Sequence, residues 1–299
     1  MEKIQNIAIV GRGAIGVIYG SLLMKKMGYK HVAFLCDAKR KARYEKQDVL
    51  FNGQPMHFQY ITQGDDFYPD LIIVATKYVK IKQTIEEIRP FVHESTVIIS
   101  TMNGIKSEDD LREAFGRYHV IRTIAQKMSS VYHNNQVTAH PLGELVIGAE
   151  DRNDLANLAR LEEVFDYAEI PYLLSTDIKR DAYSKLMINC GVNQTCAAYH
   201  LTYGDLQKEG KYRDMVIATM REVAKVAAFE DIRLTEEDIT AWMKALDAVD
   251  PQGMPSMAQD VLENRPTEIG LFAGMIVPLA HKYKVKVPYN ENFLAMLGN

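Results

Sequence analysis

The sequence predicts an α/β domain with a mostly parallel sheet, followed by an all-helical domain. Up to about residue 170, short apolar runs rich in Ile and Val alternate with amphipathic stretches, which is typical of a parallel sheet covered by helices. From about Asp177, helical periodicity continues almost to the end without strand-like alternation. Because no extended linker separates the two patterns, we expect closely packed domains at residues 1–174 and 175–299, with a cleft between them.

The segments that predict buried strands have nearly continuous hydrophobicity. They are residues 3–10, 31–37, 70–77, 95–103 and 117–125. Residues 136–150 indicate a hairpin or edge pair with Pro141 and Gly143 in its turn, and a helix from about Asp154 to Tyr167 follows. In the second domain, glycine and proline mark the expected helix boundaries, and Pro278 should kink the penultimate helix.

Composition excludes several classes of function. Of the 299 residues, 47% are hydrophobic and 25% charged, which supports two domains with substantial cores. The 35 basic and 39 acidic residues are interspersed, without the basic block that a nucleic-acid-binding face needs. No apolar run is long enough for a secretory or membrane segment. Cys36, Cys190 and Cys196 fit neither a fully paired disulfide framework nor a metal site, so we expect a cytoplasmic protein without a metal.

The motif GRGAIG follows the first strand directly and opens a helix. Its glycines have the G-x-G-x-x-G spacing of a dinucleotide-binding Rossmann domain, and an acidic residue lies about 20 positions downstream, as that pattern requires. The glycines allow a tight turn, close approach of a pyrophosphate and close packing of helix on strand, while the helix N-terminus offers N–H groups to the anion. The residues expected to bind the dinucleotide are Gly11, Arg12, Gly13, Ala14, Ile15 and Gly16.

The acidic residue is Asp37, at the end of the second strand. Its carboxylate can accept hydrogen bonds from a ribose hydroxyl and would repel a 2′-phosphate, which favours NAD. Lys39, Arg40, Lys41 and Arg43 follow at once, and a cation there could hold the 2′-phosphate of NADP. A solvated helix start explains this basic cluster equally well, so both cofactors stay open.

Two further strands end in polar residues, Thr76-Lys77 and Asn103-Gly104. Each pair alone could be a surface residue or a turn. Both are expected at the carboxyl edge of the sheet, where open parallel sheets bind ligands. This shared position with the glycine loop favours a role for Lys77 and Asn103 beside the cofactor.

Residues 182–200 predict a mostly apolar helix that carries Lys185, Asn189 and Asn193 at a spacing of four. A step of four advances a side chain by only about 40° around an α-helix, so the three share one face. The wet side of an amphipathic helix would explain them, but the other positions are apolar in nearly every direction, which favours a cleft. Lys185 is then a candidate proton donor, and the amides can orient a carboxylate or hydroxyl.

Two polar residues lie further along the chain. Ser256 with Gln259 fits a capping box, which would make Ser256 a helix N-cap. Glu268 is expected in the first turn of a new helix after Arg265-Pro266, where a carboxylate is favourable. For both residues the structural and the functional interpretation stay open.

Together these blocks resemble the ketopantoate reductase (2-dehydropantoate 2-reductase) family over nearly the full length. The blocks are GRGAIG, Lys77, Asn103-Gly104, K-L-x-x-N-x-x-x-N at 185–193, and S-M-x-Q-D with R-P-T-E-I within 256–269. The resemblance implies a Rossmann domain and an all-helical C-terminal domain like that of 6-phosphogluconate dehydrogenases. It also implies NADP(H) as cofactor and reduction of 2-dehydropantoate to (R)-pantoate in pantothenate synthesis.

The resemblance also implies roles for single residues. Lys185 resembles the family's general acid, and Glu268 the carboxylate that works with it and with the substrate. Lys77 resembles a residue beside the nicotinamide ribose. The residues that resemble substrate-orienting positions are Asn103, Asn189, Asn193 and Ser256. The implied partner is a small 2-keto acid; the helical domain is consistent with a homodimer, which the sequence does not decide.

The chain departs from the family pattern at positions that concern substrate and cofactor. Gly270 and Ala273 replace a common aspartate and asparagine, Gly253 and Tyr203 replace asparagines of many members, and Cys36-Asp37 stand where an arginine often follows the second strand. A paralogue for another 2-keto acid or an imine, a β-hydroxyacid dehydrogenase and a non-catalytic nucleotide-binding regulator therefore stay open. A regulator would not need Lys185 and Glu268.

Overall fold

The computed structural model describes residues 3–298, which form two compact units. The first unit comprises the residues up to Met102 together with Ser107–Ile178. The second comprises Asn103–Lys106 and the chain from Lys179 onward. A short segment inside the first unit's sequence therefore belongs to the second unit.

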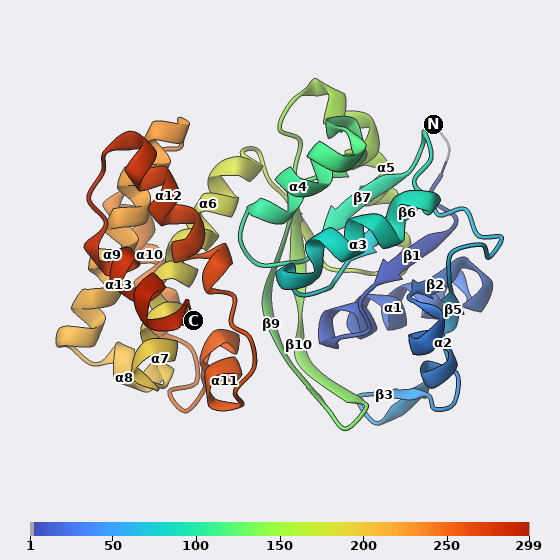
Figure 1. Cartoon of the computed structure of the whole chain (residues 1–299), viewed down its shortest axis with the longest axis horizontal. Helices are drawn as coiled ribbons and strands as arrows, with labels where there is room; N and C mark the ends of the chain where they lie inside the picture. Colours follow the sequence, from blue (N-terminus) through green and yellow to red (C-terminus); the bar gives the residue numbers. More distant parts are fainter. Residues whose placement is uncertain (1–2, 299) are drawn as a thin grey trace. The chain divides into compact units, whose positions relative to one another are not determined.

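The first unit is built on a six-stranded parallel sheet of order β5-β2-β1-β6-β7-β8 (Figure 1). The strands are β1 (Ile7–Val10), β2 (Val32–Leu35), β5 (Gln59–Ile61), β6 (Leu71–Val74), β7 (Val97–Ser100) and β8 (Val120–Ile121). This order is that of dinucleotide-binding sheets, and it reverses between β1 and β6, where such sheets bind their ligands. The predicted Rossmann fold is confirmed.

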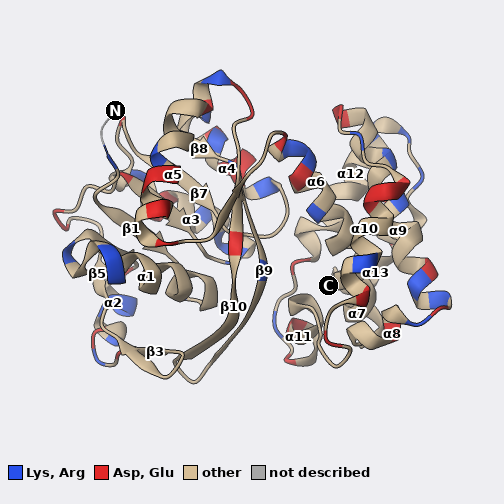
Figure 2. Ribbon diagram, turned by 180° about the vertical axis from the view of Figure 1, so that it is seen from behind, with Lys and Arg blue, Asp and Glu red and all other residues tan. Residues whose placement is uncertain are grey.

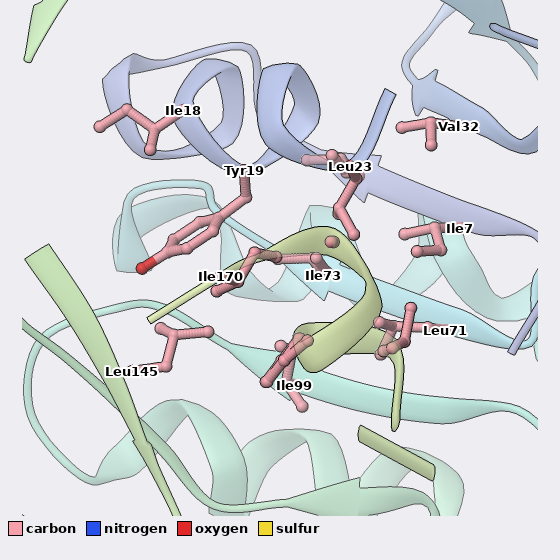
Figure 3. Close-up of a cluster of buried hydrophobic side chains, with 14 of the residues drawn as sticks. Ile7, Ile18, Tyr19, Leu23, Val32, Leu71, Ile73, Ile99, Leu145 and Ile170 are labelled. Atoms are coloured by element: carbon pink, nitrogen blue, oxygen red, sulfur yellow. The ribbon is translucent and has the colours of Figure 1, made fainter. Parts of the chain in front are cut away.

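Successive residues of the central strands pack on opposite faces of the sheet, and both faces are buried. On one face Ile7 and Ile73 join a cluster with Tyr19 of α1 (Ala14–Met27), as Figure 3 shows. On the other face Ala8 and Ile72 join a cluster with residues of α3 (Ile81–Ile88) and α4 (Lys106–Phe115). The strands are continuously apolar because neither face meets water. The remaining helices of this unit are α2 (Ala38–Tyr44) and α5 (Leu155–Ala168).

A second sheet in the same unit contains a long antiparallel hairpin, β9 (Thr123–His133) and β10 (Gln136–Ile147). Its turn is Asn134-Asn135, both at positive φ, which asparagine tolerates well. The predicted turn at Pro141 and Gly143 is wrong, since both lie near a register shift within β10. The other strands are β3 (Val49–Phe51), β4 (Gln54–Met56) and β11 (Tyr172–Leu174).

The second unit is helical, as predicted. Its helices are α6 (Ile178–Ile188), the π-helical turn η6 (Asn189–Asn193), α7 (Gln194–Tyr199), α8 (Tyr203–Gln207), α9 (Lys211–Ala227), α10 (Glu236–Asp247), α11 (Ser256–Leu262), α12 (Ala273–Tyr283) and α13 (Pro288–Leu297). The 3₁₀ turns of the chain are η1 (Tyr29–His31), η2 (Tyr78–Lys80), η3 (Arg89–Phe91), η4 (Arg117–His119), η5 (Arg152–Asp154), η7 (Ala228–Glu230) and η8 (Ile269–Leu271).

Charges of both signs occur on the helices of both units (Figure 2). Within residues 3–298, no helix is long and apolar enough to cross a membrane. The same residues contain no group of three or more side chains that could hold a metal ion.

Candidate active site

The glycine loop between β1 and α1 is shaped by close backbone contacts. A Cβ atom on Gly11, whose φ is +105°, would lie 2.5 Å from the carbonyl oxygen of Ala75, and one on Gly16 would lie 2.0 Å from that of Gly11. Gly13 differs, because a Cβ there meets nothing within 4 Å. Gly13 is also the N-cap of α1, and no side chain caps the helix. Open space beside an uncapped helix N-terminus fits the pyrophosphate of a dinucleotide.

The other expected cofactor residues follow the neighbouring strands. Asp37 follows β2 and caps α2, because its Oδ1 accepts a hydrogen bond from the backbone N–H of Arg40 at 2.7 Å. Lys77 follows β6, is exposed, and precedes η2. Since β2, β1 and β6 are adjacent and parallel, Asp37, the glycine loop and Lys77 lie at one edge of the sheet.

Arg12 contacts protein groups within the same unit. Its guanidinium lies over the ring of Tyr44, 3.8 Å from the centroid, and donates to the hydroxyl of Tyr60 at 3.0 Å. It also donates to Oδ1 of Asn135 at 2.5 Å. Burial raises the pKa of Tyr60, and the hydrogen bond from Arg12 opposes that rise. The side chain of Arg12 therefore connects the glycine loop to the β9–β10 turn by a hydrogen bond.

In the second unit, Asn103 joins the expected general acid to the expected carboxylate. Lys185 Nζ donates to Oδ1 of Asn103 at 3.3 Å, and Nδ2 of Asn103 donates to Oε2 of Glu268 at 2.9 Å. All three side chains belong to residues that are partly buried. The structure thus brings together residues 82 and 165 positions apart in the sequence. We call Lys185, Asn103 and Glu268 the lysine cluster.

The backbone holds Asn103 beside the segment that carries Glu268. Gly104 has φ +84°, and a Cβ on it would lie 3.1 Å from the carbonyl oxygen of Leu271 in η8. Glu268 directly precedes η8, whereas α12 begins only at Ala273. The prediction that Glu268 lies in the first turn of a helix is therefore wrong. A tight approach of two irregular segments places the amide against the carboxylate.

The helix that carries Lys185 is not a regular α-helix through Asn193. It ends at Ile188, and Asn189–Asn193 form the π-helical turn η6. The prediction of one continuous α-helical face is therefore wrong at this point. Asn189 is 9% exposed, and its buried Nδ2 has no hydrogen-bond partner among the described residues. An orphaned buried donor costs about 1–3 kcal/mol, and π turns are frequent at functional sites, so this amide is suited to receive a ligand oxygen.

Ser256 does not form the predicted capping box. It is exposed and is the first residue of α11, whose N-cap is Pro255. Gln259 instead donates from Nε2 to the carbonyl oxygen of Met254 at 3.0 Å. Asn193, the last residue of η6, is partly exposed.

Two departures from the family pattern contact each other. The N–H of Tyr203 donates to the carbonyl oxygen of Gly253 at 2.9 Å, and a Cβ on Gly253 would lie 3.0 Å from the tyrosine ring. Burial raises the pKa of Tyr203 to about 12. The aromatic ring thus fills the space that a side chain at position 253 would need.

The sequence pattern does not single out Gln194 as a site residue. This fully buried residue directly follows η6 and donates from Nε2 to the carbonyl oxygen of Cys190 at 2.8 Å and to Oδ1 of Asn290 at 3.2 Å. Its Oε1 accepts the N–H of Ala273 at 2.8 Å. Gln194 therefore links η6 to the start of α12. The available signal was a third amide in an apolar stretch, immediately after Asn193.

Two family models together match nearly the whole chain. The model described as ketopantoate reductase PanE/ApbA matches residues 7–152, and the model of its C-terminal region matches residues 177–299. The curated 2-dehydropantoate 2-reductase of Lactococcus lactis is 26% identical over 98% of this chain and 96% of the relative. The curated 2-dehydropantoate 2-reductase of Vibrio cholerae is 22% identical over 96% of this chain and 94% of the relative.

Solved structures share the fold over the same extent. 2-Dehydropantoate 2-reductase from Geobacter metallireducens has a TM-score of 0.87 and 25% identity, covering 98% of this chain and 99% of that one. D-Mandelate dehydrogenase, solved with NADH and anilino(oxo)acetate, has a TM-score of 0.87 and 24% identity, covering 98% and 97%. With both of its regions matched by the family models, the chain belongs to the ketopantoate reductase family of oxidoreductases.

Proposed function

We propose that this chain is an NAD(P)H-dependent reductase of a 2-keto acid, with the conversion of 2-dehydropantoate to (R)-pantoate as the first candidate reaction. The observation that carries the proposal is the lysine cluster, in which Asn103 links Lys185 to Glu268 through two hydrogen bonds. The glycine loop is evidence for the nicotinamide cofactor of this proposal, because Gly13 leaves open space at the start of an uncapped helix.

In this proposal Lys185 acts on the keto oxygen of the substrate. When bound, the nicotinamide supplies a hydride to the keto carbon. As the carbonyl becomes an alkoxide, the Lys185 ammonium donates a hydrogen bond and then a proton to that oxygen, which yields the hydroxyl. Asn103 directs its oxygen to Lys185 and its nitrogen to Glu268, so that the ammonium is held in one orientation. The orphaned Nδ2 of Asn189 would gain an acceptor from the substrate carboxylate or hydroxyl.

A second candidate substrate is another 2-keto acid. Tyr203 and Gly253, which replace asparagines of many family members, contact each other here, so this chain lacks two polar side chains that those members have. The structurally similar D-mandelate dehydrogenase acts on an aromatic 2-hydroxy acid, as its name states. Benzoylformate is therefore the comparison substrate of choice. A non-catalytic regulator would gain nothing from the lysine cluster.

The test follows NADH and NADPH absorbance with 2-dehydropantoate, benzoylformate and a small panel of other 2-keto acids. We expect Lys185→Ala to lower kcat by about a hundredfold or more, because it removes a donor aimed at the developing alkoxide. Nucleotide binding, measured by fluorescence titration, should stay unchanged. Lys179→Ala is the matched control, since Lys179 is an exposed lysine on the same helix. No oxidation of either nucleotide with any keto acid would eliminate the proposal.

A further inference from the structure

The carboxylate of Asp37 is held at the carboxyl end of β2, next to the glycine loop. Oδ1 accepts the backbone N–H of Arg40 at 2.7 Å, which fixes the rotamer of the side chain. The side chain is nevertheless 42% exposed, so it can be reached by a ligand. A carboxylate at this place in a dinucleotide-binding sheet accepts hydrogen bonds from the adenosine ribose.

The guanidinium that follows Asp37 is shared between two carboxylates. Arg40 Nε lies 3.3 Å from Oδ2 of Asp37, and Nη1 lies 3.7 Å from Oε1 of Glu87 on α3. One positive charge against two negative charges leaves this group, which we call the Asp37 group, with a net charge of about −1 at neutral pH. Burial first, and then the charge of Asp37, raise the pKa of the neighbouring Cys36 thiol to about 11.

Two of the other three cations of the basic cluster, Lys41 and Arg43, are also engaged with protein groups. Lys41 Nζ lies 2.9 Å from Oδ2 of Asp65. Arg43 donates to the hydroxyl of Tyr44 at 3.1 Å and lies over its ring, 4.8 Å from the centroid. Of the two interpretations of this cluster, these contacts favour a helix start bound to its own unit over a preformed phosphate site.

We propose that this chain prefers NADH to NADPH, and that Asp37 sets the preference. The inference rests on the proposed function. A 2′-hydroxyl of NADH can donate to the carboxylate, whereas the 2′-phosphate of NADPH carries a charge of about −1.5 to −2 and would meet the net negative Asp37 group. Binding of the phosphate would require Arg40 to leave two carboxylates.

The test measures the Kd of NADH and of NADPH by fluorescence titration without substrate, and kcat/KM for each with the best keto acid. We expect the wild-type protein to bind NADH about tenfold tighter or more, since a tenfold ratio needs only a modest charge repulsion. Asp37→Asn keeps a good N-cap but removes the charge, and should lower the NADH/NADPH ratio about tenfold. Asp37→Ser, which also caps, should act in the same direction and guards against a folding defect.

Asp151→Asn is the matched control. Asp151 is 43% exposed and caps η5 by accepting the N–H of Asn153. It also pairs with Arg117 at 2.8 Å. Its exposure, capping role and ion pair are therefore similar to those of Asp37, but it lies elsewhere in the unit. Its substitution should leave the nucleotide ratio unchanged. Equal or tighter binding of NADPH by the wild type would overturn the proposed preference for NADH but would leave the proposed function intact. An unchanged ratio in both Asp37 variants would also overturn the proposed preference, and failure of both nucleotides to bind would overturn the proposed function as well.

Discussion

Asn103 has a side chain that suits its place between an ammonium and a carboxylate. An amide is both a donor and an acceptor, so one end accepts from Lys185 while the other donates to Glu268. An aspartate would lose the donor, and a serine would be too short to span both groups. The two charged partners also determine which end of the amide faces which side, since neither partner can bond to the wrong end.

Two replacements of Asn103 should distinguish its effect on the orientation of Lys185 from the effect of an added negative charge. Asn103→Ala should lower kcat about tenfold or more at every pH, because the Lys185 ammonium loses its fixed orientation. Asn103→Asp places a second carboxylate against Glu268, so its turnover should be low near neutral pH and recover partly in acid, where one of the two carboxyls is protonated. The measurement is a pH–rate profile of both variants. Parallel profiles for the two variants would contradict this role.

Single residues of the site were predictable to different degrees. Family resemblance pointed to Lys185, Asn103 and Glu268, and the structure shows two hydrogen bonds that join them. Sequence spacing could not have done so, because the contacts span 82 and 165 residues and form only in the folded unit. The unpaired donor of Asn189 was likewise beyond prediction, since burial and missing partners are properties of packing.

The π turn explains why helical periodicity was misleading between residues 185 and 193. Apolar spacing indicates a helix but carries no signal for one wider turn within it. Here a Cβ on Gly191 would lie 2.9 Å from the side chain of Met220 and 3.0 Å from the carbonyl oxygen of Val216, both on α9. The turn therefore packs tightly against its neighbour, and that contact is set by tertiary structure.

Gln194 should act as a positioning residue for the lysine cluster. Gln194→Met keeps the volume but removes the acceptor of the Ala273 N–H and the donor to Cys190, so η6 and the segment after Glu268 lose their link. We expect kcat to fall about tenfold or more while the nucleotide Kd stays unchanged, because small misplacements have large effects on rate. The unfolding free energy should also fall by about 1–3 kcal/mol for an orphaned buried group.

Gln207→Met is the control for this experiment. Gln207 is also a glutamine with two backbone hydrogen bonds, to the carbonyl oxygens of Leu246 and Val249. It should lose stability without a selective loss of kcat. Restoration of kcat by stabilising conditions alone would show that Gln194 contributes only to folding.

Both units contain carboxylates that are held ionised by their neighbours. Burial opposes ionisation of Glu150, but Arg122 and Arg112, each 2.7 Å away, lower its pKa. In the second unit, burial likewise opposes ionisation of Asp238, but the N–H of Thr235 and the guanidinium of Arg180 lower its pKa. Glu108 is the opposite case, because burial raises its pKa.

The protein should therefore lose stability in acid. A carboxyl group whose pKa is lowered by folding contributes stability above its unfolded pKa of about 4, and this contribution disappears as the pH falls through the folded value. Because burial raises the pKa of Glu108, the contribution of this group to stability increases as the pH falls. It therefore offsets part of the stability that the other carboxylates lose. Denaturant unfolding between about pH 7 and about pH 3 measures the effect. Glu150→Gln should reduce the dependence of the unfolding free energy on pH, and exposed Glu169→Gln should change this dependence less. An unfolding free energy that rises as the pH falls from about 7 to about 3 would contradict the prediction.

The general architecture followed from hydrophobic pattern because the sheet of the first unit is buried on both faces and the helices of the second unit bury apolar residues such as Val216, Met220 and Val223. Apolar strands predicted a sheet covered on both faces, and helical periodicity predicted the second unit. The turn of the long hairpin was misplaced because Pro141 and Gly143 are stronger turn signals than Asn134-Asn135. A proline and a glycine can equally mark an irregularity inside a strand, and pairing with β9 decided between the two.

The segment Asn103–Lys106 has a consequence for protein engineering. It lies between β7 and α4 in the sequence, yet it groups with the helical unit. A chimera that grafts the chain from Lys179 onward onto a foreign nucleotide-binding half would import the lysine and the glutamate but leave the bridging amide behind. Transplantation of this unit therefore calls for two crossovers more than a simple exchange of halves.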